Sequence, residues 1–243
     1  MDTTLISQKT NELSDVDFVY STTSDFSYIN TLDDGCSAIV LEATVVYFEF
    51  KNIQSLLKTG KRLAARVYKI YQHALQDVCR NTGGYFNCYS PTSFLMIYPK
   101  EKYDISYVVD VAIKTADLVS VGLRDCIEKH THNNFSMGID FGNVLGTKTC
   151  CENMYTQTVW FGHAIEKAAV ISGLCQRPFF VGVSGTVFHH LNEDLLKTTK
   201  RILGIKKSVD IWTRVSYQLD NVKHHLYQTN FHRSFEGGEI EEK

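Results

Sequence analysis

Residues 38–50 read AIVLEATVVYFEF, and this stretch decides the fold class. Most of its residues are β-branched or aromatic, and such side chains fit the pleated surface of a sheet. A short, nearly continuous apolar run is typical of a strand buried inside a sheet. We therefore expect residues 38–50 to form a central strand.

Three helices are predicted after this strand. Residues 63–78 read LAARVYKIYQHALQDV, with apolar residues at helical spacing, and the segment from Asn81 to Gly84 would end this helix. Residues 107–128 have the pattern of a second amphipathic helix. Residues 162–173 include AIEKAAVISG and form the third helix, which Gly173 would close.

Further strands are predicted between and after the helices, because short apolar segments there are bounded by turn residues. Residues 85–87 and 94–98 are predicted to form a hairpin around Ser90 and Pro91. Further strands are predicted at 135–141, 155–160 and 179–183, followed by a final strand pair within 202–217. A short helix is predicted at 186–191. This order predicts an α+β fold in which helices pack on a mixed, mainly antiparallel sheet.

The composition argues against several classes of protein. The 243 residues carry 25 basic and 27 acidic side chains, and 44% of them are hydrophobic, which is typical of a globular domain and not of a disordered chain or a nucleic-acid coat. No run approaches the ~20 apolar residues of a membrane-spanning helix, and the first residues lack a signal-peptide pattern. The seven cysteines show no two-residue spacing. We expect a cytoplasmic protein that binds neither nucleic acid nor a membrane.

The chain is predicted to contain one domain with two extensions. Residues 1–37 are polar, rich in Ser, Thr and Asp with scattered aromatics, and are read as an N-terminal extension lying against the domain. Residues 38–217 form the domain, because no Pro-, Gly- or Ser-rich linker interrupts them. Residues 218–243, which end in EGGEIEEK, are read as a C-terminal tail.

Five fragments, in this order and spacing, resemble the catalytic domain of the class III adenylate/guanylate cyclase family. They are VVYFEFKNI at 45–53, GGYFNCYSPTSFLMIY at 83–98, MGIDFGNVLG at 137–146, WFGHAIEKAA at 160–169 and GIKKSVDIWTRV at 204–215. The resemblance covers most of the chain, from about residue 38 to residue 217. It implies the ferredoxin-like class III cyclase fold, in agreement with the predicted order of elements.

The resemblance also implies a known chemistry. In this family, two aspartates hold two metal ions that clamp a nucleoside triphosphate while its 3′-hydroxyl attacks the α-phosphorus. Other residues read the base, orient the ribose and stabilise the charge that develops on the phosphates. The site lies between two domains arranged head to tail. The resemblance therefore implies a homodimer with a nucleotide ligand, and Mg or Mn only where the chain is an active cyclase.

All six family positions are occupied by other residues in this chain. The two metal-binding aspartates fall on Glu49, which is one methylene longer, and on Thr92, which is uncharged. The base-reading lysine, its partner, the ribose-binding asparagine and the charge-stabilising arginine fall on Cys88, Val159, Glu166 and Val170. One carboxylate and one hydroxyl make a poor cradle for two hard cations, and losing the arginine removes about 3 kcal/mol of stabilisation. No cofactor is expected.

Four residues could still contribute to a rebuilt metal site, namely Glu49, Asp140, His163 and Glu166. His163 and Glu166 are three residues apart, so they share one face of a helix. The alternative interpretation is that His163 caps this helix, that Glu166 complements its positive end, and that Glu49 ends a solvated strand.

A basic cluster precedes and begins the first predicted helix. It consists of Lys58, Lys61, Arg62 and Arg66. These side chains could meet phosphates, but a solvated helix face is the commoner explanation of such a pattern.

We favour the hypothesis of a catalytically degenerate cyclase-like domain that acts as a dimeric nucleotide-binding or regulatory module. The alternative is a divergent active cyclase that uses Glu49 with Mg or Mn and releases a cyclic nucleotide and pyrophosphate. A third hypothesis is a scaffold in which the extension before Ala38 recruits a partner.

Overall fold

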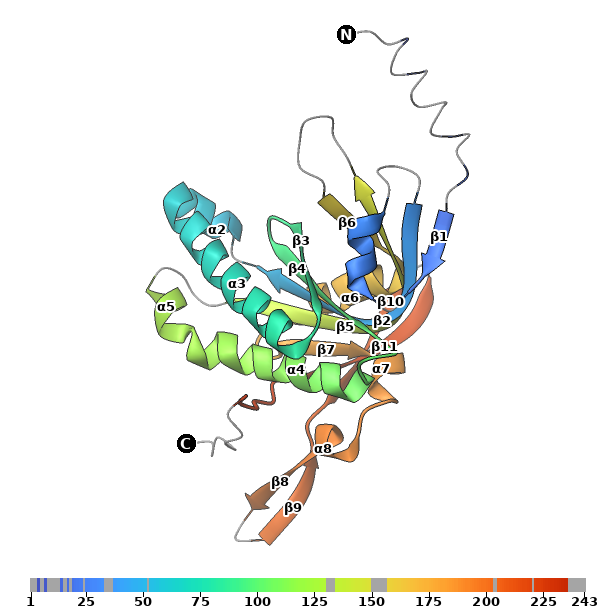
Figure 1. Cartoon of the computed structure of the whole chain (residues 1–243). Helices are drawn as coiled ribbons and strands as arrows, with labels where there is room; N and C mark the ends of the chain where they lie inside the picture. Colours follow the sequence, from blue (N-terminus) through green and yellow to red (C-terminus); the bar gives the residue numbers. More distant parts are fainter. Residues whose placement is uncertain are drawn as a thin grey trace.

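β2 (Ser37–Phe50) lies at the centre of the sheet, as its sequence predicts. It pairs antiparallel with β4 (Ser93–Pro99) on one side and with β5 (Phe135–Thr149) on the other. Figure 1 shows the computed structural model, which describes residues 4, 7, 14, 17, 19–23, 25–32, 37–51, 53–129, 134–149, 157–202, 205–219 and 221–235.

The described residues form a main sheet of nine strands, in the order β10-β11-β7-β5-β2-β4-β3, with β1 on β2 and β6 on β5. The remaining strands are β1 (Val19–Thr22), β3 (Tyr85–Ser90), β6 (Gln157–Phe161), β7 (Val181–Ser184), β10 (Thr213–Leu219) and β11 (Val222–Thr229). Only the β1–β2 and β5–β7 pairs of this described sheet are parallel. The predicted mixed, mainly antiparallel sheet is therefore confirmed.

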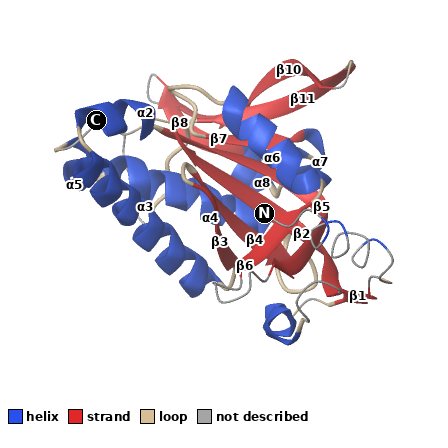
Figure 2. Ribbon diagram, turned by 90° about the horizontal axis from the view of Figure 1, so that it is seen from above, coloured by secondary structure: helices blue, strands red, loops and turns tan. Residues whose placement is uncertain are grey.

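The two faces of β2 belong to two different cores. Because successive strand residues point to opposite faces, Val46, Phe48 and Phe50 share one face, and Val45, Tyr47 and Glu49 share the other. The first face packs against α3 (Lys61–Thr82) and α4 (Ile105–Asp117) in the larger core. The second packs against α6 (His163–Leu174). Figure 2 shows these helices on opposite sides of the sheet.

The helices follow the predicted segments, with one interruption. α3 ends at Gly83, whose φ of 79° is the left-handed conformation expected of a glycine cap. The helix predicted at 107–128 starts as α4, widens into a π-helical turn, η2 (Leu118–Gly122), and ends as α5 (Arg124–Glu128). The short helices are α2 (Ile53–Thr59), α7 (Gly185–Phe188) and α8 (Glu193–Leu196).

The C-terminal strands correct the prediction of one strand pair within 202–217. β8 (Lys197–Ile202) and β9 (Ile205–Asp210) form a separate two-stranded sheet, whereas β10 and β11 form the hairpin that joins the main sheet. Asn221 in the turn of that hairpin has a φ of 62°, which asparagine tolerates. Because β11 pairs with both β10 and β7, the sheet continues to Thr229, and the predicted tail boundary at residue 218 falls inside it.

The segment before residue 37 contributes to the domain. β1 pairs with β2, and η1 (Phe26–Thr31) is a 3₁₀ helix that buries Ile29 in the core on the α6 side. The Phe26 ring lies 4.9 Å from that of Tyr85 and 6.1 Å from that of Trp160. Among the described residues, no helix combines the length and the apolar character that crossing a membrane requires.

Candidate functional site

An open pocket of about 630 Å³ lies where β2 ends, beside the β3–β4 turn and the C-terminal end of α6. Glu49, Lys51, Thr92, Gly173 and Arg177 are among its lining residues. The backbone N–H of Phe50 donates to the carbonyl of Thr92 at 2.8 Å, which holds the end of β2 beside the turn. The structure thus brings together Glu49 and Thr92, the two residues at the predicted metal positions.

Lys51 is a residue of this pocket that the sequence analysis did not identify. Its Nζ lies 3.9 Å from Oε2 of Glu49 and donates to the carbonyls of Cys175 at 2.7 Å, Ser172 at 3.0 Å and Gly173 at 3.4 Å. The last carbonyls of a helix lack partners within the helix, so the Lys51 ammonium satisfies the end of α6. The sequence contained one indication of this role: Lys51 comes two residues after Glu49, so an extended chain places both side chains on the same face.

Thr92 is engaged within its own turn. Its Oγ1 lies 3.2 Å from Oγ of Ser90, and its backbone N–H donates to the same hydroxyl at 3.2 Å. Ser90 in turn bonds Oγ of Ser93 at 2.6 Å. Such side-chain to backbone bonds are typical of Ser and Thr in turns.

These contacts test whether the pocket suits the two divalent cations that the family resemblance implies. Mg²⁺ and Mn²⁺ prefer several carboxylate or carbonyl oxygens. Among the described residues that line the pocket, Glu49 is the one carboxylate, and it already faces the Lys51 ammonium. The other side-chain oxygens are neutral: the Thr92 hydroxyl, which is bonded within its turn, and the amides of Asn134 and Gln176. Nowhere in the described ranges do three or more His, Cys, Asp or Glu side chains gather as a metal cluster. The donor set does not fit a two-metal site.

Cys88 lies on the other side of the sheet from this pocket. It pairs with Phe94, which pairs with Phe48, so these three side chains face α3. Nε2 of Gln72 on α3 lies 3.5 Å from Sγ of Cys88. Asn87 occupies the pocket side of β3 instead, and its Nδ2 donates to the carbonyl of Thr158 at 3.2 Å.

The remaining predicted site residues do not line the pocket. Val159 is half-buried on β6, and Val170 packs in a small cluster with Tyr217 and Leu226. His163 and Glu166 do meet, with Nδ1 and Oε2 at 3.4 Å, but both side chains are largely exposed at the start of α6. This geometry suits an exposed pair at a helix start.

Asp140 is the buried member of the predicted metal set. It is 4% exposed on β5, with Oδ1 3.8 Å from Nζ of Lys167. Burial raises the pKa of its carboxyl, while a hydrogen bond with Ser184 and the charge of Lys167 act in the opposite direction. Within the described part of the chain, Asp140 Oδ1 and the buried Tyr217 hydroxyl lack hydrogen-bond partners. Asp140 thus belongs to a polar cluster beneath α6.

Comparison with known proteins identifies the fold. No family model matches the sequence, and a search of curated proteins gives no match. Among solved structures, the adenylyl cyclase CyaB from Pseudomonas aeruginosa is similar with a TM-score of 0.63 and 10% identity, over 81% of this chain and 97% of that one. A class III adenylyl cyclase-like ATP-binding protein from P. aeruginosa gives 0.65 and 12%, over 79% of this chain and 44% of that one.

A further similar structure is the non-canonical dimeric guanylyl cyclase domain of the RhoGC fusion protein from the aquatic fungus Blastocladiella emersonii. Its TM-score is 0.55 with 11% identity, over 78% of this chain and 97% of that one. The fold that the sequence fragments predict is thereby confirmed.

Proposed function

We propose that this chain, which has the fold of class III adenylyl and guanylyl cyclase domains, is a catalytically degenerate dimeric module that binds a nucleotide or regulates a partner. The main observation behind this proposal is the contact between Lys51 and Glu49. It places a fixed ammonium beside the one carboxylate at the predicted metal positions. A tethered cation there opposes the binding of free divalent cations, since like charges repel at short range.

The pocket retains features that suit an anionic ligand. Lys51 and Arg177 line it together with the single carboxylate of Glu49, so cations outnumber carboxylates among these lining residues. A concave surface with such a balance attracts phosphate groups. Arginine is suited to phosphate because its planar guanidinium forms paired hydrogen bonds. The similar P. aeruginosa structure described as an ATP-binding protein supports a nucleotide as the ligand.

Thermal unfolding of the full chain with ATP, GTP, CTP, UTP and their cyclic forms tests the ligand. We expect at least one of them to stabilise the protein in EDTA as well as in magnesium, because the protein's own cations provide the charge. A ligand at a hundredfold excess over its Kd adds about 2.7 kcal/mol of stability. Arg177→Gln should lower the affinity, whereas the exposed Arg214→Gln on β10 should not. If none of these nucleotides stabilises the protein, the ligand part of the proposal is wrong.

The alternative of a divergent active cyclase rests on the proximity of Glu49 and Thr92 at the pocket. It predicts that the protein with manganese converts a nucleoside triphosphate to a cyclic nucleotide and pyrophosphate, which mass spectrometry would detect. Product formed by the natural chain but not by Glu49→Ala would replace the degenerate assignment with this one.

A further inference from the structure

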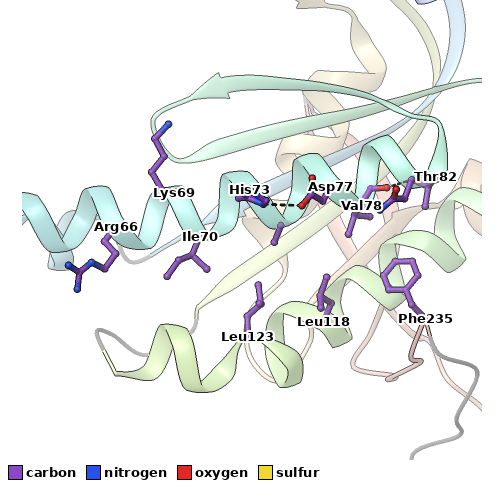
Figure 3. Close-up of a pocket in the computed structure, with 12 residues that line it drawn as sticks. Arg66, Lys69, Ile70, His73, Asp77, Val78, Thr82, Leu118, Leu123 and Phe235 are labelled. Atoms are coloured by element: carbon purple, nitrogen blue, oxygen red, sulfur yellow. Dashed lines mark hydrogen bonds and ion pairs between the residues drawn. The ribbon is translucent and has the colours of Figure 1, made fainter.

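A second pocket lies on the opposite side of the sheet, as a groove between α3 and the η2–α5 segment. Its volume is about 880 Å³, and Figure 3 shows Ile70 of α3 facing Leu118 and Leu123 across it. The lining residues of α3 run from Arg66 to Thr82, and Phe235 closes one end. At 1.5 Å per residue, the groove follows α3 from Arg66 to Thr82 for between four and five turns, or ~24 Å. That is the length of an ordinary helix.

The π-helical turn shapes the second wall of this groove. The backbone N–H of Leu123 donates to the carbonyl of Leu118 at 2.8 Å, a bond that spans five residues. In an α-helix, residues five apart point about 140° away from each other. The wider π turn brings Leu118 and Leu123 to the same side, so both line the groove. π turns of this kind are frequent at functional sites.

Charge is distributed unevenly along the same face of α3. Arg62, Arg66, Ile70, Ala74 and Val78 follow one another at four-residue spacing, as a stripe that turns slowly around α3. The last four of them line the groove, and Arg62 lies one turn before it. The stripe thus begins with two exposed arginines and continues with apolar side chains. In the ranges that the structure describes, neither arginine forms an ion pair with a carboxylate, whereas Asp77 near the other end is paired with His73 at 3.0 Å and Arg80 at 3.3 Å.

We propose that this groove binds an amphipathic helix of a partner protein, with an acidic end over Arg62 and Arg66 and an apolar face on Ile70, Ala74, Leu118 and Leu123. A helix in a groove places anchors at three- and four-residue spacing, which matches the apolar walls. The unpaired arginines then set the direction of the bound helix, because complementary charge governs orientation and association rate. The apolar residues lie in a recess between helices, which favours an inserted helix over a flat membrane surface.

Fluorescence anisotropy with two synthetic peptides tests this proposal on the full chain. Both peptides are 18-residue helices with the same leucine stripe, and one carries glutamates at the end of the helix where the other carries lysines. We expect the acidic peptide to bind at least about tenfold more tightly than the basic one. Arg62→Glu combined with Arg66→Glu should reverse that preference, and the exposed control Lys206→Glu with Lys207→Glu should leave it unchanged.

A second variant tests the apolar part of the groove. Ala74→Arg puts a long charged side chain on the groove wall, so it should weaken both peptides, and thermal unfolding verifies that the variant folds. Failure of both peptides to bind, or equal binding of both, would overturn the proposal. It is overturned as well if phosphatidylserine vesicles bind through Arg62 and Arg66 while the peptides do not.

Discussion

Asp140 shows how a residue that attracts attention in the sequence can have a different role in the fold. Its acidic side chain and its position beside the predicted cleft suggested a metal ligand. The structure buries it under α6, with the ammonium of Lys167 as its nearest charge. A buried carboxylate loses the solvation of its charge, and the hydrogen bond with Ser184 and the charge of Lys167 at 3.8 Å compensate for only part of that loss. The pKa of the Asp140 carboxyl is therefore raised, because burial outweighs these favourable contacts.

This raised pKa predicts a pH dependence of stability. When folding raises a carboxyl pKa above its ordinary value of 3.8, the native state binds the proton more tightly, and stability falls as the pH rises through that window. Asp140→Asn cannot ionise. We therefore expect the urea midpoint of the variant, relative to the natural chain, to be higher at about pH 7.5 than at about pH 4. Asp210→Asn, on an exposed strand, controls for general charge effects. A difference between the Asp140 variant and the natural chain that stays constant with pH would contradict this assignment.

The strands and helices that could be predicted are those whose apolar pattern is long and regular. β2 follows from the nearly continuous apolar run at residues 38–50, and α3 and α6 follow from the helical patterns at residues 63–78 and 162–173. The hairpin of β10 and β11 was missed, because its strands are partly polar and the pairing of β11 with β7 is a long-range contact.

The candidate site was predictable only in part, because a side chain's face depends on strand register. The family resemblance assigned Glu49 and Thr92 to the two metal positions, and in the structure both residues line the same pocket. Cys88 does not line that pocket, because it pairs with Phe94 and faces α3 on the other side of the sheet. The contacts of Lys51 depend on where the C-terminal end of α6 lies relative to β2. The apolar pattern of the sequence does not predict that position.

The approach of α6 to the sheet depends on one glycine. A Cβ at Gly138 on β5 would overlap the carbonyl oxygen of Ala168 and the backbone N of Ser172 in α6. The absence of a side chain lets α6 lie close to β5, which brings its last carbonyls to Lys51. Backbone atoms of a packed helix cannot move aside at little cost, so this position tolerates no larger residue without a shift of the helix.

Gly138→Ala should therefore lower the free energy of unfolding by about 1–3 kcal/mol, measured by urea denaturation. Gly173→Ala is the matched control, because a Cβ there would meet no atom within 4 Å and alanine favours a helix by up to ~1 kcal/mol. The two substitutions should have effects of opposite sign. Equal effects would mean that α6 is not held by this close contact.

The two faces of the whole domain are covered unequally. α3, α4, η2 and α5 lie together on one face, whereas α6 lies on the other, over β5, β2 and β7 (Figure 2). Beyond α6, toward β3, the rings of Tyr47 and Tyr89 lie 5.8 Å apart, and Tyr89 is 42% exposed. Exposed aromatic residues are enriched in protein interfaces, so this side of the sheet is where we expect the proposed homodimer to form.

The dimer gives a prediction for the solution mass of the protein. Light scattering coupled to size-exclusion chromatography should give twice the mass of one chain. Tyr89→Lys should shift the protein to the monomer, because a buried unpaired ammonium is costly at an interface. Val121→Lys on η2 is the matched control, since Val121 is 43% exposed on the other side of the sheet, and it should leave the mass unchanged. A natural chain that stays monomeric at high concentration would contradict the dimer, and a Tyr89→Lys dimer would move the interface to another surface.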